Sequence, residues 1–260
     1  MARYVTDFAA DTRLLDHEVR RVLVIGHRGA AGDYDENTLA AFRHAAACGV
    51  DGIEFDVRQL DDALIVLHDD TLERTTDGHG HYKAQSLAAL RALRTPRGEQ
   101  VPLLHEVLET MPAGLVNVEV KEAGIAPAVL AALRAWLATR PQRAADLLLS
   151  SFDGPTTTAL ADGRGGAMRL GVLYAREEGF DAALARARAL GAWSLHLPLA
   201  DVDAAAIARV HGDGLRALVY TVNAERDLAR CHASGVDGVF SDFPVRALAS
   251  VRRLARRDVS

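Results

Sequence analysis

The stretch Leu115–Ser151 reads LVNVEVKEAGIAPAVLAALRAWLATRPQRAADLLLSS, and its pattern decides the fold. It begins with Leu115–Val120, a short run rich in valine, and ends with Leu147–Ser151, a short run rich in leucine. Between them, Ala126–Thr139 is rich in alanine and leucine and is long enough to form a helix. Short apolar runs on both sides of such a helix are typical of a strand–helix–strand unit with parallel strands.

The same alternation extends along most of the chain. The other candidate strands are Val22–Ile25, Gly52–Val57, Leu64–Leu67, Leu170–Leu173, Trp193–Leu197, Leu215–Val222 and Gly238–Phe240. The other candidate helices are Thr38–Cys48, Asp181–Leu190, Asp203–His211 and Arg226–Ser234. This many repeats favour a closed (β/α)8 barrel, or TIM barrel, and the 260 residues of the chain suit that fold. An open doubly wound sheet is the alternative.

The barrel is expected to be irregular near its second and third strands. With the two runs in the quoted stretch there are nine candidate strands for eight places. Moreover, only Arg58–Ala63 separates Gly52–Val57 from Leu64–Leu67. A parallel crossover needs about a dozen residues or more, so these two strands cannot be joined in the usual way.

The segment after His68, at about residues 69–111, is expected to be an insertion over one end of the barrel. It contains several glycines and histidines, a short helical patch at Ser86–Leu93 and a loop at Pro96–Gly98. It is too short to be a full domain with its own core. We therefore expect residues 1–260 to form a single barrel domain with this small insertion.

The composition excludes several classes of function. The net charge is −5 and the sequence pI is about 6.1, whereas a nucleic-acid-binding protein would show a basic stripe. Met1–Arg21 has no apolar core of a signal peptide, and no run of about 18 apolar residues occurs. We expect a cytoplasmic protein with a small-molecule substrate, no nucleic-acid partner and no stable membrane insertion. The oligomeric state, including a homo-oligomer, is left open.

Polar residues alternate with apolar residues in the candidate strand Gly52–Val57. Glu54 and Asp56 point to one face and Ile53 and Phe55 to the other. A buried barrel strand is normally apolar on both faces, so these two carboxylates need an explanation. They would repel each other in a site of low dielectric unless a cation lies between them. Carboxylate oxygens are the ligands that Mg²⁺ and Ca²⁺ prefer.

The same alternation recurs at Val116–Lys121, where Asn117, Glu119 and Lys121 share a face. Glu119 would be a third carboxylate for the cation, and Lys121 a positive charge for a phosphate oxygen. The alternatives are an exposed edge strand with alternating charges, or a salt bridge across the strand. Two separate strands with carboxylates on one face favour one divalent cation, which the ligands leave open as Mg²⁺, Ca²⁺ or Mn²⁺.

Two apolar runs end in a histidine. The run Val22–Gly26 is followed by His27 and Arg28, and Leu64–Leu67 is followed by His68. Barrel enzymes assemble their active sites at the C-terminal ends of the strands. Cleavage of a phosphodiester needs a base, an acid for the leaving alkoxide, and cations for the phosphoryl oxygens. Histidine suits both proton-transfer roles, and arginine can bind phosphate through two hydrogen bonds.

Together these motifs resemble those of the glycerophosphodiester phosphodiesterases of the bacterial, cytosolic type. The motifs are His27-Arg28-Gly29, Glu36-Asn37-Thr38, Glu54-Phe55-Asp56-Val57, His68-Asp69, Asn117-Val118-Glu119-Val120-Lys121, Tyr220-Thr221-Val222-Asn223 and Asp237-Gly238-Val239-Phe240-Ser241-Asp242. They occur in the family's order and span nearly the whole chain. Three positions depart from the family pattern: Asp35 replaces a proline, Tyr220 a tryptophan and Ser241 a threonine. These departures concern the shape of the substrate pocket and not the chemistry.

The resemblance implies a TIM barrel with a small insertion after the second histidine. It also implies metal-dependent hydrolysis of glycerophosphodiesters to sn-glycerol 3-phosphate and an alcohol. The implied acid/base pair is His27 and His68, and the implied metal ligands are Glu54, Asp56 and Glu119. The implied phosphate-binding residues are Arg28 and Lys121, with Glu36 at the mouth of the site.

Other assignments are weaker. His196, Tyr220 and Asn223 are candidate substrate-binding residues, although a core position is as good an explanation for His196. His79 and His81 are more easily explained as part of a polar loop than as a second metal site. The alternative activities are those of a lysophospholipase D or a phosphoinositide-type phospholipase on the same barrel, and a barrel that binds phosphate esters without catalysis ranks lower. The attacking group is left open between water and the substrate's own 2-hydroxyl.

Overall fold

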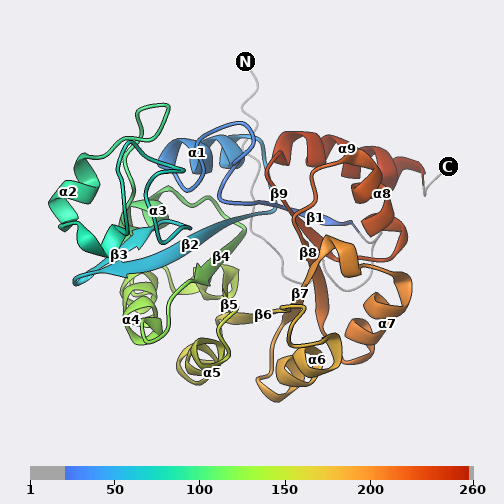
Figure 1. Ribbon diagram of the computed structural model, residues 1–260. Helices are drawn as coiled ribbons and strands as arrows, with labels where there is room; N and C mark the ends of the chain where they lie inside the picture. Colours follow the sequence, from blue (N-terminus) through green and yellow to red (C-terminus); the bar gives the residue numbers. More distant parts are fainter. Residues whose placement is uncertain (1–20, 258–260) are drawn as a thin grey trace.

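The computed structural model describes residues 21–257, in which eight parallel strands close into a barrel surrounded by helices (Figure 1). These strands are β1 (Leu23–Gly26), β2 (Gly52–Leu60), β4 (Leu115–Val120), β5 (Leu147–Ser151), β6 (Arg169–Leu173), β7 (Ser194–Pro198), β8 (Arg216–Tyr220) and β9 (Gly238–Ser241). The barrel closes because β1 pairs with both β9 and β2. The predicted TIM barrel is therefore confirmed, and the open sheet is excluded. The expectation of no signal peptide concerns a stretch that lies almost entirely outside the described residues.

The ninth candidate strand is part of a hairpin and not of the barrel. The strand β3 (Ala63–Val66) runs antiparallel to the end of β2, with Val57 opposite Val66 and Leu60 opposite Ala63. Asp61 has a φ of 52° in the tight turn between them. An antiparallel partner needs only such a turn, which explains how six residues can join two strands. The predicted irregularity is confirmed at this place.

The helices outside the barrel follow the predicted alternation. They are α1 (Leu39–Ala47), α3 (Leu104–Thr110), α4 (Ala126–Leu137), α5 (Gly154–Gly163), α6 (Phe180–Ala189), α7 (Ala204–Gly212), α8 (Glu225–Ala233) and α9 (Pro244–Arg257). The five helices predicted from the sequence begin and end within two residues of the predicted positions. The prediction omitted α3, α5 and α9. In α5, Thr156, Thr157 and Thr158 are β-branched and favour helices weakly. The Asp153 side chain caps α5 by accepting a hydrogen bond from Thr156 N.

The segment between β3 and α3 forms a layer beside the barrel, at the left of Figure 1. It contains a short 3₁₀ helix, η2 (Tyr82–Ala84), and the helix α2 (Leu87–Ala92). Its apolar side chains share a small hydrophobic cluster with the β2–β3 hairpin. The cluster consists of Leu60, Ile65, Leu67, Leu72, Tyr82, Leu90 and Val101. The helix α3 falls within the expected insertion at 69–111 but contacts α1 and α4, and so belongs to the ring of barrel helices.

Two separate hydrophobic clusters lie between the strands and the helices. One joins β2, β4 and β5 to α1, α3, α4 and α5, and the other joins β1 and β7–β9 to α6–α9. Strand β6 contributes Leu170 to the first cluster and Val172 to the second. A fourth cluster, which is also small, consists of Ile25, Leu115, Leu148, Leu218 and Phe240 and links strands from both sides of the barrel. No helix in the described part of the chain is long and apolar enough to cross a membrane.

Candidate active site

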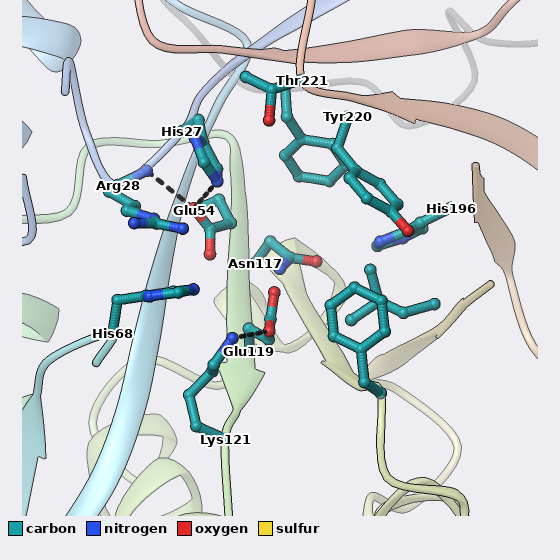
Figure 2. Close-up of a pocket in the computed structure, with 13 residues that line it drawn as sticks. His27, Arg28, Glu54, His68, Asn117, Glu119, Lys121, His196, Tyr220 and Thr221 are labelled. Atoms are coloured by element: carbon teal, nitrogen blue, oxygen red, sulfur yellow. Dashed lines mark hydrogen bonds and ion pairs between the residues drawn. The ribbon is translucent and has the colours of Figure 1, made fainter. Parts of the chain in front are cut away.

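A cavity of about 220 Å³ lies at the C-terminal ends of the barrel strands. Figure 2 shows that its two sides differ in character. Charged and titratable residues line one side, namely His27, Arg28, Glu54, His68, Glu119 and Lys121. Aromatic, apolar and neutral polar residues line the other side, together with a buried histidine. In Figure 2, His196, Tyr220 and Thr221 lie on that side, and the lining of the cavity also includes Asn117, Phe152, Leu173 and Phe240.

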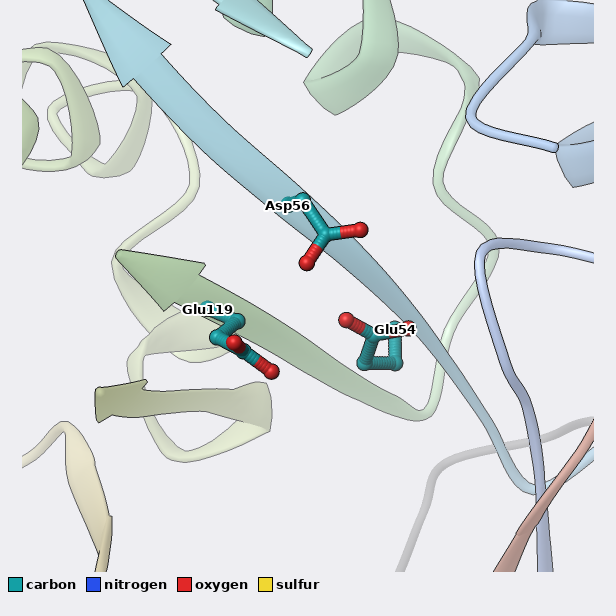
Figure 3. A group of neighbouring side chains, drawn as sticks. All are labelled: Glu54, Asp56 and Glu119. Atoms are coloured by element: carbon teal, nitrogen blue, oxygen red, sulfur yellow. The ribbon is translucent and has the colours of Figure 1, made fainter. Parts of the chain in front are cut away.

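Three carboxylates form a cluster on the charged side. Strand β2 carries Glu54 and Asp56, and β4 carries Glu119, which pairs in register with Asp56. Each carboxylate offers one oxygen that lies within 4.8 Å of the others, as Figure 3 illustrates. Glu54 and Asp56 are 2% and 1% exposed, so water screens their mutual repulsion poorly.

The cluster fits a hard divalent cation. Glu54 Oε1 is buried and has no hydrogen-bond partner, which is a costly arrangement for a carboxylate oxygen. Burial and the neighbouring charge of Asp56 raise the pKa of both Glu54 and Glu119 above the ordinary value. A bound cation would remove this repulsion and provide a partner for the free oxygen. No other group of three potential metal ligands occurs within residues 21–257. His81, which was considered for a second metal site, accepts a hydrogen bond from Lys83 N.

Two positively charged side chains, Lys121 and Arg28, lie beside this carboxylate cluster. Lys121 Nζ lies 2.6 Å from Glu119 Oε1 and 3.5 Å from Asp56 Oδ1. The guanidinium of Arg28 lies near the other oxygen of Asp56, with Nε 3.3 Å from Oδ2. Burial tends to raise the pKa of Asp56, but the charges of Lys121 and Arg28 hold it below the ordinary value. Arg28 has a φ of 48°, and its backbone N–H donates to Glu54 Oε2 at 2.7 Å.

His27 is held by a carboxylate from the far end of the chain. Its Nδ1 lies 2.6 Å from Oδ1 of Asp242, which follows β9. The carboxylate can only accept, so Nδ1 carries the proton in this tautomer and Nε2 is directed to Glu54, 4.0 Å away. Asn223 fixes Asp242 in turn, because its amide donates to Asp242 Oδ2 at 2.6 Å and its oxygen accepts from Asp242 N at 2.9 Å.

His68 has a similar support from different residues. Its Nδ1 lies 2.5 Å from Asp69 Oδ1, and its backbone carbonyl accepts hydrogen bonds from Arg58 Nε at 3.0 Å and Nη2 at 2.7 Å. Arg58 is a buried residue of β2, two positions after Asp56. Figure 2 shows His27 and His68 on the same side of the cavity, near Arg28 and Glu54. Both histidines therefore have Nδ1 engaged and Nε2 available to a ligand.

The other side of the cavity holds His196 and Tyr220. His196 is fully buried on β7, its Nε2 lies 2.9 Å from Ser194 Oγ, and its Nδ1 has no partner. Burial lowers the pKa of His196 to about 3, so its ring is neutral at ordinary pH. The Tyr220 hydroxyl donates to the Tyr174 carbonyl at 2.8 Å. Phe152 is 43% exposed at the rim, with its ring edge-to-face with Tyr220 at 5.9 Å.

Glu36 lies beside the cavity and does not line it. Its carboxylate accepts from Arg28 Nη1 at 2.8 Å and from both terminal nitrogens of Arg74. The next residue, Asn37, donates to Asp56 Oδ2 at 2.8 Å and has a φ of 56°. The residue after that, Thr38, caps α1 by accepting from Ala41 N. The Glu36-Asn37-Thr38 motif thus connects the mouth of the site to the carboxylate cluster and to a helix start.

The structure brings most of the predicted site residues into one cavity and adds residues that sequence reasoning missed. The added residues are Arg58, Asp69, Arg74, Phe152 and Asp242, whereas the candidate Asn223 does not line the cavity and instead holds Asp242. Arg58 continues the alternation of Glu54 and Asp56 on β2, so a signal for it existed. Asp69 follows a candidate histidine directly, and Asp242 lies in a motif quoted for the family resemblance. We find no sequence signal for Arg74 or Phe152.

Comparison with known proteins establishes the class to which this barrel and its site belong. The model of the Glycerophosphoryl diester phosphodiesterase family matches residues 27–246, and the chain belongs to this family of phosphoric diester hydrolases. It is 31% identical to the glycerophosphodiester phosphodiesterase of Caldanaerobacter subterraneus subsp. tengcongensis, over 90% of this chain and 99% of the relative. It is 32% identical to the enzyme of that name from Bacillus altitudinis, over 86% and 96% of the two chains.

A solved structure supports the same assignment. The Oleispira antarctica phosphodiesterase, solved in complex with the product sn-glycerol-3-phosphate, superposes with a TM-score of 0.80. The two chains are 29% identical, and the match covers 89% of this chain and 97% of the other. The match covers nearly the whole of both chains, so the two proteins share the barrel architecture.

Proposed function

We propose that this protein hydrolyses glycerophosphodiesters to sn-glycerol 3-phosphate and an alcohol, with one divalent cation. One observation carries the proposal: two buried carboxylates and a half-buried one lie beside two histidines whose Nε2 atoms are both available to a ligand. The relatives named glycerophosphodiester phosphodiesterase and the neighbour with bound sn-glycerol-3-phosphate support this substrate class.

Glu54, Asp56 and Glu119 would hold the cation, which supplies a Lewis acid for a phosphoryl oxygen when it is bound. Their oxygens suit Mg²⁺, Ca²⁺ or Mn²⁺. Arg28 and Lys121 bind the remaining phosphoryl oxygens, because each presents a half-buried positive charge beside the cluster. Glu36 carries a negative charge and would repel a phosphate. It therefore serves the site by holding Arg28 and not by direct contact with phosphate.

His27 and His68 provide the two proton transfers. One Nε2 takes the proton from the attacking hydroxyl, whether that belongs to water or to the substrate's own 2-hydroxyl. The other Nε2 gives a proton to the oxygen of the leaving alcohol. Asp242 and Asp69 keep Nδ1 of each ring engaged, so that Nε2 points to the reacting groups.

The neutral side of the cavity would contact the part of the substrate that is not phosphate. His196 offers its unpaired Nδ1 as a hydrogen-bond acceptor for a substrate hydroxyl, if Nε2 donates to Ser194. Tyr220 and Phe152 provide aromatic surface on the same side. A cavity of about 220 Å³ suits a small polar diester.

The alternative phospholipase activities find less support. A lipid substrate would need an apolar rim, and within the described residues only Phe152 and Val245 are large, apolar and exposed. Of these two, only Phe152 lines the cavity. A barrel that merely binds phosphate esters is also disfavoured, because both histidines and all three carboxylates are present.

The test is release of glycerol 3-phosphate from glycerophosphocholine, with lysophosphatidylcholine as the competing substrate. We expect EDTA to abolish the activity and added Mg²⁺, Ca²⁺ or Mn²⁺ to restore it. His27→Ala should lower kcat about 10²- to 10⁴-fold, the usual contribution of a general acid or base. Glu54→Gln should abolish cation-dependent activity and also the cation-dependent rise in stability, which is about 2.7 kcal/mol at a hundredfold excess over Kd.

The matched control is Glu109→Gln, which changes an exposed carboxylate that pairs with Arg140 on the surface. This variant should keep both the activity and the cation-dependent stabilisation. Activity that survives both EDTA and His27→Ala would contradict the proposed mechanism. A clear preference for lysophosphatidylcholine would favour the phospholipase alternative.

A further inference from the structure

Arg74 occupies an unusual position beside the candidate active site. It lies in the segment between β3 and η2, and its side chain is 49% exposed and does not line the cavity. Its guanidinium nevertheless binds two carboxylates that come from different parts of the chain. Nη1 and Nη2 donate to the two oxygens of Glu36 at 2.6 and 2.8 Å, and Nε donates to Asp69 Oδ2.

Each of these carboxylates has its second partner inside the site. Glu36 Oε1 also accepts from Arg28 Nη1 at 2.8 Å, and Asp69 Oδ1 lies 2.5 Å from His68 Nδ1. A continuous chain of hydrogen bonds therefore runs from Arg28 through Glu36, Arg74 and Asp69 to His68. Arg74 lies in the middle of this chain of contacts and donates hydrogen bonds to both of its carboxylates.

The contribution of Arg74 to the two carboxylates is large. Its hydrogen bond is the main reason that the pKa of Asp69 lies well below the ordinary value. Burial tends to raise the pKa of Glu36, but hydrogen bonds and charge from Arg74 and Arg28 bring it below the ordinary value. A planar guanidinium with a two-point contact also fixes direction, which a lysine ammonium cannot do to the same extent.

We propose that Arg74 is a positioning residue that holds Asp69 and Glu36, and through them orients the His68 imidazole and the Arg28 guanidinium. This inference rests on the proposed function, because it assigns Arg74 a role in the same reaction. The segment after β3 then does more than cover the barrel edge. It supplies the group that sets the geometry between the second histidine and a phosphate-binding arginine.

A purely structural role is the competing explanation, since Arg74 also ties this segment to the loop before α1. The two roles differ in what they change. Loss of a structural tie would lower the melting temperature and leave the His68 ring unaltered in the folded protein. Loss of positioning would alter the state of the His68 ring and the chemical step while the fold stays intact.

The experiment compares Arg74→Gln and Arg74→Lys with the full-length wild-type protein. For Arg74→Gln we expect kcat with glycerophosphocholine to fall by roughly tenfold to a hundredfold, since small misplacements of reacting groups cost this much, with a smaller change in KM. Arg74→Lys should recover part of the loss. Arg94→Gln is the matched control, because the exposed Arg94 side chain donates to carbonyls of its own segment, and it should behave as wild type.

A second measurement does not depend on activity. In protein labelled with ¹⁵N-histidine, the His68 ring nitrogens should report a proton fixed on Nδ1 in the wild type and a mixture of tautomers in Arg74→Gln. A His68→Gln variant assigns the resonances. In a double-mutant cycle, Arg74→Gln should cost less in a Glu36→Gln background than in the wild type, because part of its role would already be lost.

The outcomes are distinct. Unchanged kcat and unchanged His68 resonances in Arg74→Gln would overturn the proposal. Reduced activity with unchanged resonances and a lower melting temperature would also overturn it, in favour of the structural role. If the wild-type protein does not cleave glycerophosphocholine, the proposed function fails, and the His68 resonances still decide whether Arg74 positions the ring.

Discussion

Polar side chains in the barrel interior are tolerated because nearly all of them have partners. Asp56 is 1% exposed and contacts Asn37, Arg28 and Lys121. His196 is the exception among the histidines of the site, because its Nδ1 is buried and unpaired. A neutral ring can tolerate this position, whereas a charged ring would lose its hydration without gaining a carboxylate partner. His196 should therefore affect the pH dependence of stability.

We predict that His196 destabilises the folded protein as the pH falls below about 6.5. Its pKa is about 3 in the folded protein, against an ordinary value of 6.5, so the unfolded chain takes up the proton first. Stability is unaffected above the ordinary value. It declines by up to about 1.4 kcal/mol per pH unit below that value, until the folded ring also takes up a proton. Urea unfolding of the wild type and His196→Gln between pH 5 and 7.5 measures the difference.

The exposed His105 provides the control, since His105→Gln should follow the wild-type pH dependence. Parallel curves for the wild type and His196→Gln would show that the ring is protonated as easily in the folded protein as in the unfolded chain.

The membership of single residues in the site could be predicted where the pattern that indicates it lies within a few neighbouring residues of the sequence. Glu54 and Asp56 share a face because strand side chains alternate, and this required only six residues of sequence. The partner of His27 is different, because Asp242 lies 215 positions away and meets His27 only when β9 closes the barrel against β1. Arg74 lies on an irregular segment, where no period relates sequence to direction. The roles assigned to the predicted site residues stay predictions until variants are measured.

At the scale of elements, the close fit between β6 and β7 determines how the neutral side of the cavity is built. Gly171 on β6 lies beneath the His196 ring and next to Ser194. A Cβ at position 171 would lie 2.4 Å from His196 Nε2 and 3.1 Å from Ser194 Oγ. The glycine thus provides the space in which the buried histidine forms its hydrogen bond.

Gly171→Ala is expected to destabilise the protein by about 1–3 kcal/mol, the usual cost of inserting a methyl group into a packed interior. It should also raise KM, because His196 must move from its place beside the cavity. Chemical denaturation and steady-state kinetics measure the two effects. Gly166→Ala is the control, since a Cβ there meets nothing within 4 Å, and this variant should match the wild type in both respects.

Helices and strands were predicted correctly where the sequence has a clear pattern of apolar residues. Long runs rich in alanine and leucine predicted α4 and α6–α8, and valine-rich or leucine-rich runs predicted the barrel strands. The sequence also predicted that the barrel is irregular between Gly52–Val57 and Leu64–Leu67, because the gap between these two runs is short. It did not predict the antiparallel hairpin, because the direction of β3 depends on the turn at Asp61 and on a ladder with β2 that extends past Val57.

At the scale of the whole molecule, the two large hydrophobic clusters between strands and helices lie on either side of one candidate active site. The carboxylate cluster comes from β2 and β4 on one side, whereas Asp242, His196 and Tyr220 come from β7–β9 and the loop that follows β9. The sequence predicted this closed architecture from the number of repeats. It did not predict the division of the core, because that depends on which helices contact one another across the outer surface. A cytoplasmic location and the oligomeric state stay predictions.

The division of the core at β6 has a consequence for protein engineering: the chain should function when it is cut. Gly165 and Gly166 are exposed and lie between α5 and β6. Fragments 1–165 and 166–260 each carry most of one hydrophobic cluster but an incomplete site. We expect neither fragment alone to release glycerol 3-phosphate and the mixture to recover activity by complementation. A cut inside α4, between Leu130 and Ala131, interrupts one cluster and should not be complemented. Equal recovery from both cuts would show that the two clusters do not act as separate units.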